Sequence, residues 1–87
     1  MEKLIIKKKV FTYQEVEKEA TMYEYVGYKI REARKLRNMN QTQFSEIIGL
    51  SRGSLGNIEA GRQKITIENL GKICRALNIN SKELLPF

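Results

Sequence analysis

Two side chains that can form paired hydrogen bonds, Arg52 and Asn57, lie in a segment whose apolar positions have the spacing of a short helix. Leu55 and Ile58 form the inward side of that helix. Arg52 and Asn57 then fall on the outward side, together with the small Gly53. Arginine can pair with guanine and asparagine with adenine, and each pair gives about 1–3 kcal/mol of discrimination. A helix that exposes such groups fits the major groove of DNA, so the spacing predicts a helix that reads base pairs.

Other chemistries lack the side chains that they need. The chain contains no histidine, and all of its 10 acidic residues are glutamates. This composition removes the usual general base and the usual zinc ligands. The single cysteine, Cys74, falls in an apolar-periodic stretch and is interpreted as a small buried hydrophobic residue rather than a reactive thiol. We therefore expect no catalytic residue, no metal site, no cofactor and no small-molecule ligand.

The length and the distribution of charge indicate one basic domain. The chain has 87 residues and a net charge of +6. Residues 1–24 contain equal numbers of lysines and glutamates, so the whole positive excess lies in residues 25–87. A basic domain attracts polyanions through the release of counterions. No apolar run approaches the roughly 20 residues that span a bilayer, and the N-terminus is unlike a signal peptide, so we expect a cytoplasmic protein without a membrane partner.

Residues 25–87 carry the start and stop signals of successive short helices. The first helix should begin at Tyr25 and end near Asn38. Asn40 and Gln43 have the spacing of a capping box at the start of the second helix, and Gly49 should end that helix in a left-handed conformation. Three further helices have their expected N-caps at Ser51, Thr66 and Asn80. We therefore predict an all-α fold with five short helices.

The segment from Tyr25 to Leu85 resembles the Cro/C1-type (XRE-type) helix-turn-helix family. The resemblance covers about seven-tenths of the chain, without an insertion, and rests on Arg34, Asn40, Gln41, Ser45, Gly49, Ser51, Ile58, Glu59, Gly61, Leu70, Ala76, Leu77 and Leu84. It implies that residues 25–87 form a compact, lambda-repressor-like DNA-binding domain of five helices.

The resemblance also implies a role for individual residues. The base-reading positions are Arg52, Gly53 and Asn57. The positions that contact DNA phosphates are Gln41, Ser51, Arg62, Gln63 and Lys64. Arg34 and Glu59 match a structural ion pair that ties the first helix to the end of the third. Gly53 and Gly56 depart from the family pattern, either because the backbone approaches DNA closely there or because the protein is a weakly specific reader.

The N-terminal extension, residues 1–24, has a different character. Residues 3–11 have the composition of a β-strand. Thr12 and Glu15 have capping-box spacing and predict a helix with Val16, Ala20 and Tyr23 on one face. We expect this extension to form a dimer contact. The alternatives are a contact with a separate protein partner, or a DNA-binding arm that uses the lysines at positions 7–9.

These features together predict a sequence-specific transcriptional regulator, of repressor type, that binds double-stranded DNA. A homodimer would read a two-fold-related operator whose half-sites lie about 34 Å apart. The resemblance extends to phage repressors, restriction–modification controller proteins and antitoxins. The alternative function is therefore an antitoxin or protein-interaction module that binds a partner protein through residues 1–24, with DNA binding secondary.

Overall fold

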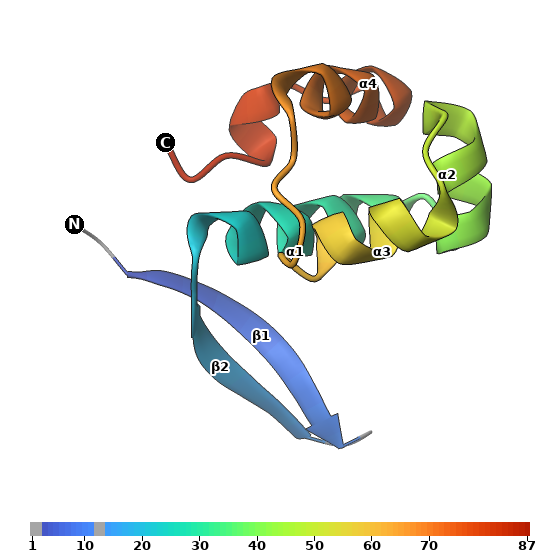
Figure 1. Ribbon diagram of the computed structural model, residues 1–87. Coiled ribbons are helices and arrows are strands. Elements are labelled where there is room, and N and C mark those ends of the chain that lie inside the picture. Colours follow the sequence, from blue (N-terminus) through green and yellow to red (C-terminus); the bar gives the residue numbers. More distant parts are fainter. Residues whose placement is uncertain (1–2, 12–13) are drawn as a thin grey trace.

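A β-hairpin projects from a body in which the helices of the described residues pack together (Figure 1). The computed structural model describes residues 3–11 and 14–87. In chain order the elements are β1 (Leu4–Phe11), β2 (Gln14–Ala20), α1 (Met22–Leu36), α2 (Gln41–Ile48), α3 (Arg52–Glu59), α4 (Ile67–Leu77) and a 3-10 turn, η1 (Ser81–Glu83). The hairpin and α4 lie on opposite sides of the layer made by α1 and α3 (Figure 1).

The helical body is held together by apolar side chains that every helix contributes. Each such side chain stabilises the fold by about 1.5–3 kcal/mol on full burial. Leu84, which follows η1, closes the core at the C-terminal end. No helix within the described residues has both the length and the apolar character to cross a membrane. The buried hydrophobic residues are Val26, Ile30, Phe44, Ile48, Leu55, Ile58, Ile73, Leu77 and Leu84.

The predicted start and end of α2 and the predicted N-caps of α3 and α4 are confirmed. Asn40 and Gln43 form the capping box of α2, and Ser51 and Thr66 cap α3 and α4. Gly49 ends α2 with a φ of 71°, a left-handed conformation that favours glycine. These caps satisfy backbone N–H groups that a helix leaves without an internal partner.

The prediction of five helices in an all-α fold is not confirmed. The described residues form four α-helices and a two-stranded sheet. The fifth predicted helix is η1, which has three residues, although Asn80 and Glu83 do form its capping box. The turn cannot extend into a longer helix because Pro86 lacks a backbone N–H and disfavours helical geometry in the residue before it.

The predicted helix in the extension is wrong. Residues Gln14–Ala20 form β2, which pairs antiparallel with β1. Tyr23 belongs to α1, and Thr12 lies outside the described residues. Val16 and Ala20 therefore belong to a strand, in which alternate side chains share a face. The register sets Lys7 opposite Glu17, and such opposite-charge pairs stabilise a hairpin. A short helix over the same residues would lack such pairing with another segment, and short helices are only marginally stable by themselves.

Helix α1 begins at Met22, three residues before the predicted start, because Thr21 and Glu24 form a capping box there. Lys18 of β2 donates a hydrogen bond of 2.7 Å to the Glu24 carboxylate. Gly61 has a φ of 76°, and a Cβ on it would lie 2.7 Å from the Glu24 Cα. We call the junction of β2 and α1, at residues 21–24, the root of the hairpin. This root is thus held against the loop that follows α3.

A buried ion pair fixes α3 against α1. The guanidinium of Arg34 donates two hydrogen bonds to the Glu59 carboxylate, of 2.8 and 2.9 Å. Both residues are about 95% buried, since Arg34 is 5% and Glu59 is 6% exposed. The helices cross closely because Gly27 faces the backbone oxygens of Ile58 and Glu59, and a Cβ on Gly27 would overlap both.

We expect Glu59→Gln to lower the free energy of unfolding by about 3–5 kcal/mol, because it leaves the Arg34 charge buried without a counter-charge. Urea unfolding measures this loss. The control is Glu68→Gln in α4. The Glu68 side chain is 78% exposed and lies 3.6 Å from Lys72. That substitution should cost at most about 0.5 kcal/mol. Equal losses in the two variants would contradict the structural role of the ion pair.

Stability should also depend on the protonation of Glu24. Hydrogen bonds from Lys18 and from the Thr21 backbone lower the pKa of Glu24 from 4.5 to about 2. The stabilisation is complete above pH 4.5 and is lost as the pH falls through about 2, because only the unfolded chain binds the proton between these values. Glu24→Gln should therefore flatten the acid decline of the unfolding free energy. Glu46→Gln, at an exposed position of α2, should keep the wild-type decline.

Candidate nucleic-acid interface

Helix α3 has one buried side and one open side. Leu55 is 0% and Ile58 is 2% exposed, so these two residues anchor the helix in the core. The Ser51 hydroxyl caps the helix by accepting a hydrogen bond of 3.0 Å from the Ser54 backbone. Arg52 and Gly53, in the first turn, are exposed. The N-terminal turn of α3 thus presents an arginine side chain and bare backbone to the outside.

Asn57 lies one helical turn further along and is tied to the loop after α3. Arg62 donates a hydrogen bond of 3.1 Å from its Nε to the Asn57 side-chain oxygen. The backbone N–H groups of Arg62 and Gln63 donate to the Asn57 carbonyl, at 2.9 and 3.2 Å. An amide oxygen has a second lone pair and the amide nitrogen has two donors, so Asn57 keeps capacity for an external partner. Arg62 therefore orients Asn57, a contact that the sequence pattern did not indicate.

Gln41 is the first residue of α2 and is half-buried beside α3. Its side-chain nitrogen donates a hydrogen bond of 3.1 Å to the Glu59 carboxylate. Glu59 thereby holds Gln41 as well as Arg34. The side-chain oxygen of Gln41 lies on the Gly56 side, where a Cβ on Gly56 would approach it to 3.6 Å. The start of α2 and the middle of α3 are thus adjacent.

The other two residues expected to contact phosphates have partners within the protein. Gln63 donates a hydrogen bond of 3.0 Å from its side-chain nitrogen to the Ser54 hydroxyl. Lys64 is exposed, and its Nζ lies 5.8 Å from the centre of the Tyr23 ring at the start of α1. The Lys64 charge is therefore directed toward the root of the hairpin.

Packing within the protein does not require glycine at position 53. A Cβ on Gly53 would have nothing within 4 Å, and a Cβ on Gly56 would make only ordinary van der Waals contact with Gln41. Neither residue has a positive φ. A glycine in an exposed helix costs about 0.5–1 kcal/mol relative to alanine. Any advantage of Gly53 must therefore come from a molecule that binds outside.

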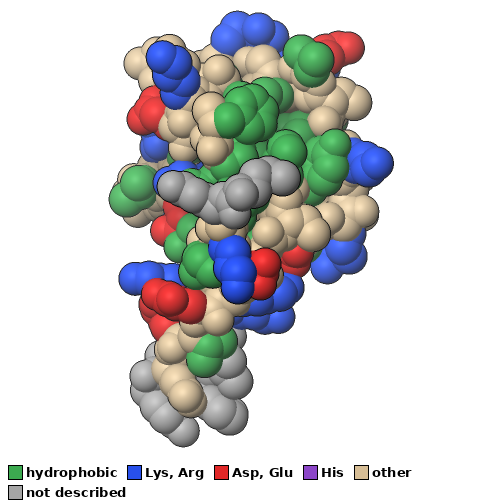
Figure 2. Space-filling view, turned by 90° about the vertical axis from the view of Figure 1, so that its left-hand side faces the viewer, with side chains coloured by type: hydrophobic (Ala, Val, Ile, Leu, Met, Phe, Trp, Pro, Cys, Tyr) green, Lys and Arg blue, Asp and Glu red, His purple; other side chains and the backbone are tan. Residues whose placement is uncertain are grey.

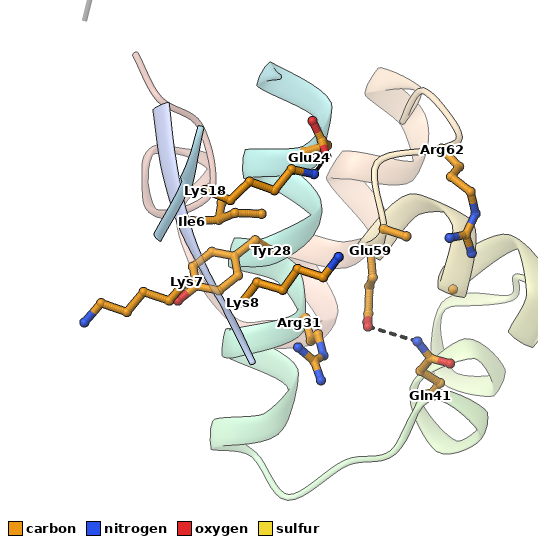
Figure 3. A pocket seen from close by; sticks show the side chains of 12 residues that line it. Ile6, Lys7, Lys8, Lys18, Glu24, Tyr28, Arg31, Gln41, Glu59 and Arg62 are labelled. Carbon is orange, nitrogen blue, oxygen red and sulfur yellow. Dashed lines mark hydrogen bonds and ion pairs between the residues drawn. The ribbon is translucent and has the colours of Figure 1, made fainter. Parts of the chain in front are cut away.

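A groove of about 660 Å³ separates the hairpin from α3. Figure 3 shows Lys8 of β1 and Arg31 of α1 on its hairpin side, and Gln41 and Arg62 on its opposite side. We call this space the hairpin groove. The sequence pattern did not indicate that the extension lies beside α3, because a predicted helix in residues 12–23 left the position of the extension undefined. Its lining residues are Ile6, Lys7, Lys8, Lys18, Glu24, Tyr28, Arg31, Gln41, Gly56, Glu59, Ala60 and Arg62.

The described residues contain no group of three or more histidine, cysteine or acidic side chains that could hold a metal ion. Cys74 is partly buried in α4, and this burial raises the pKa of its thiol. A raised pKa reduces the thiolate fraction and therefore the reactivity of a cysteine. The polar groups at the start of α2, in the first turn of α3 and in the loop after α3 are hydrogen-bonding or cationic, which suits an anionic polymer.

Comparison with known proteins agrees with this geometry. Residues 30–84 match the helix-turn-helix family HTH_3. Control protein C.BamHI of Bacillus amyloliquefaciens is 34% identical over 62 residues, which span 70% of this chain and 76% of that protein. Antitoxin PezA of Streptococcus pneumoniae serotype 4 is 30% identical over 60 residues, which span 69% of this chain but 38% of the antitoxin.

Two solved structures have the same helical arrangement. The restriction–modification controller protein C.AhdI from Aeromonas hydrophila superposes with a TM-score of 0.70 and 28% identity, covering 72% of this chain and 96% of that one. The biofilm regulator SinR, solved in complex with DNA, superposes with a TM-score of 0.64 and 25% identity, covering 68% of this chain and 95% of that one. The chain therefore belongs to the Cro/C1-type helix-turn-helix family of DNA-binding transcriptional regulators.

Proposed function

We propose that this protein is a sequence-specific transcriptional regulator, of repressor type, that inserts α3 into the major groove of double-stranded DNA. One observation carries the proposal. The first turn of α3 exposes Arg52 and Gly53, while Leu55 and Ile58 on its other side are almost completely buried. A helix that is rigidly anchored from below and open at its N-terminal end has the form that major-groove reading requires.

Arg52 and Asn57 are the proposed base readers. Arg52 is exposed and can form two hydrogen bonds with guanine. Asn57 can pair with adenine, and the hydrogen bond from Arg62 supports this role because it restricts the rotation of the amide before DNA arrives. Gly53 lies between them and lets the backbone approach the base edges.

The proposed phosphate contacts surround α3. Gln41 lies at the N-terminus of α2, where backbone N–H groups and the helix dipole favour an anion. Ser51 caps α3 and is exposed, so its hydroxyl can also donate to a phosphate. The remaining proposed contacts, on the loop after α3, are Arg62, Gln63 and Lys64.

We further propose that the protein binds a two-fold-related operator as a homodimer. Major-groove helices of such a dimer must lie one helical turn of DNA apart, about 34 Å. The longest extent of one chain is 32 Å, so two copies side by side fit that spacing. Exposed apolar side chains that a dimer could bury are also present, since Leu36 is 80%, Ile67 is 90% and Phe87 is 79% exposed.

A second candidate function is that of an antitoxin-like module that binds a partner protein through residues 1–24. The similarity to PezA favours it, and so does the hairpin, whose outer strand edges have no partner strand within the described residues. Co-expression with the product of a neighbouring toxin-like reading frame tests this function. The antitoxin-like function requires that this product form a stable complex with the full chain and that the complex be lost when residues 1–20 are removed.

Replacing the proposed base readers should change specificity. We expect Arg52→Ala and Asn57→Ala each to cost about 1–3 kcal/mol on the preferred site and to relax the preference at one position. Lys64→Ala should weaken binding to all sequences alike. Selection of bound sites from a random DNA pool at physiological salt, followed by titration of each variant, measures both effects.

The same selection tests the dimer, because a homodimer should recover a two-fold-related consensus. The wild-type protein is the reference for every titration. Equal losses on all sequences for the three variants would refute the division between base readers and phosphate contacts, and recovery of no consensus would refute specific binding.

Gly53→Ala should separate stability from binding. The added methyl group meets nothing within 4 Å inside the protein, so the unfolding free energy should rise by about 0.5–1 kcal/mol. The same methyl group should obstruct the close approach of DNA and weaken binding about tenfold, or about 1.4 kcal/mol. Thermal unfolding and anisotropy titration on the selected site measure the two changes.

Gly71→Ala is the matched control for Gly53→Ala. Gly71 lies in α4, away from α3, and its added methyl group would approach only the flexible end of the Arg75 side chain, at 3.2 Å. This variant should keep the wild-type affinity for DNA. Unchanged affinity in Gly53→Ala as well would show that the glycine does not serve close approach.

A further inference from the structure

The face of the hairpin that lines the hairpin groove is basic, whereas the opposite face carries the glutamates. Alternate residues of a strand share a face, so the register places Lys8 with Val16 and Lys18 on one face. Lys7 falls on the other face, opposite Glu17, with Glu15 and Glu19 nearby on β2. Figure 3 shows the Lys8 side chain directed into the groove, toward Glu59, and the Lys7 side chain directed away from it.

The acidic groups of the hairpin groove are already paired. Glu24 forms a salt bridge of 2.7 Å with Lys18, and Glu59 forms one of 2.8 Å with Arg34. Within the described part of the chain, neither Lys8 nor Arg31 takes part in a salt bridge. Among the described residues, the lining of the groove therefore has an excess of positive charge, with five basic and two acidic side chains.

The hairpin groove opens beside the proposed DNA-reading surface. Its side opposite the hairpin consists of Gln41 at the start of α2, Gly56 and Ala60 on the outward side of α3, and Arg62. A helix in the major groove is flanked by the sugar-phosphate backbones that border that groove. A backbone that passes α3 on the Gln41 side would thus lie between α3 and the hairpin.

Several contacts fix the position of the hairpin relative to the helical body. Leu4 and Ile6 of β1 and Ala20 of β2 are half-buried at the base of the hairpin. At its root, Glu24 is fixed by Lys18 and packs against Gly61 of the loop after α3. Figure 2 shows charged side chains around the base of the projecting hairpin, while hydrophobic side chains gather on the helical body.

We propose that the hairpin is a DNA-contacting wing, in which Lys8, supported by Arg31, binds a backbone phosphate in the hairpin groove. This inference rests on the proposed function. A protein-binding role is less favoured because the exposed apolar area of the described part of the hairpin is small, with Ile5 42% and Val16 37% exposed. The charge of the groove is complementary to a phosphate and not to an apolar partner surface.

The test compares Lys8→Gln with Lys7→Gln in the full chain. The two substitutions remove the same charge from neighbouring residues. Both residues line the hairpin groove, but the Lys8 side chain is directed into it and the Lys7 side chain is directed away from it. Binding to a duplex selected from the random pool is measured by anisotropy between 50 and 300 mM salt. Loss of one phosphate contact makes the negative slope of log affinity against log salt about 0.9 less steep, and binding becomes about eightfold weaker near 0.1 M. We expect this change for Lys8→Gln and the wild-type slope for Lys7→Gln.

Three outcomes would overturn the proposal that the hairpin is a DNA-contacting wing. One is an equal change of slope in the two variants, which would indicate only an effect of net charge. Another is no change in either variant. The third is a shift of the monomer–dimer equilibrium in Lys8→Gln by sedimentation, which would assign the hairpin to a protein interface. Failure of the proposed function itself is distinguishable, because the wild-type protein would then select no consensus site.

Discussion

The bidentate ion pair between Arg34 and Glu59 is the constraint on which the proposed DNA-reading surface depends. Arg34 also donates a hydrogen bond of 2.7 Å to the Met39 carbonyl before α2, and Glu59 accepts one from Gln41 at the start of α2. One pair of buried charges therefore fixes α1, α2 and α3 relative to one another. Burying two charges costs free energy, but each nitrogen of the guanidinium and each oxygen of the carboxylate has a hydrogen-bond partner, and these bonds define a single arrangement of the three helices.

The buried side of α3 is firmly anchored, so its outer side can carry a residue that lowers helix stability but leaves room for a binding partner. Leu55 and Ile58 supply burial, and Ser51 supplies the cap. Gly53 contributes nothing to the packing and lowers the helix propensity. Such a local cost is tolerable because the core and the ion pair determine where the helix lies, and it is typical of positions whose requirement comes from a binding partner.

The hairpin lies outside the helical body, but it too is held by a few specific contacts. Its strands pair with each other, and its root is fixed by the Thr21–Glu24 capping box and by the close contact between Glu24 and Gly61. Because Gly61 belongs to the loop that also orients Asn57 through Arg62, the same loop supports both the hairpin and α3. A wing placed in this way would follow any movement of α3.

The sequence by itself determined the helical body, because caps such as Asn40 with Gln43 and the apolar positions of α3 act over a few residues. It also determined which side of α3 is open. Tertiary structure alone decided that residues 14–20 form a strand, since the capping-box spacing of Thr12 and Glu15 is local whereas pairing with β1 is not. It likewise decided that Lys8 faces α3 and that Arg62 holds Asn57. The place of Lys8 depends on contacts between segments distant in the chain. Asn57 and Arg62 are five residues apart, but they meet only because the chain turns at Gly61, whose φ is 76°. Residue spacing by itself indicates neither contact.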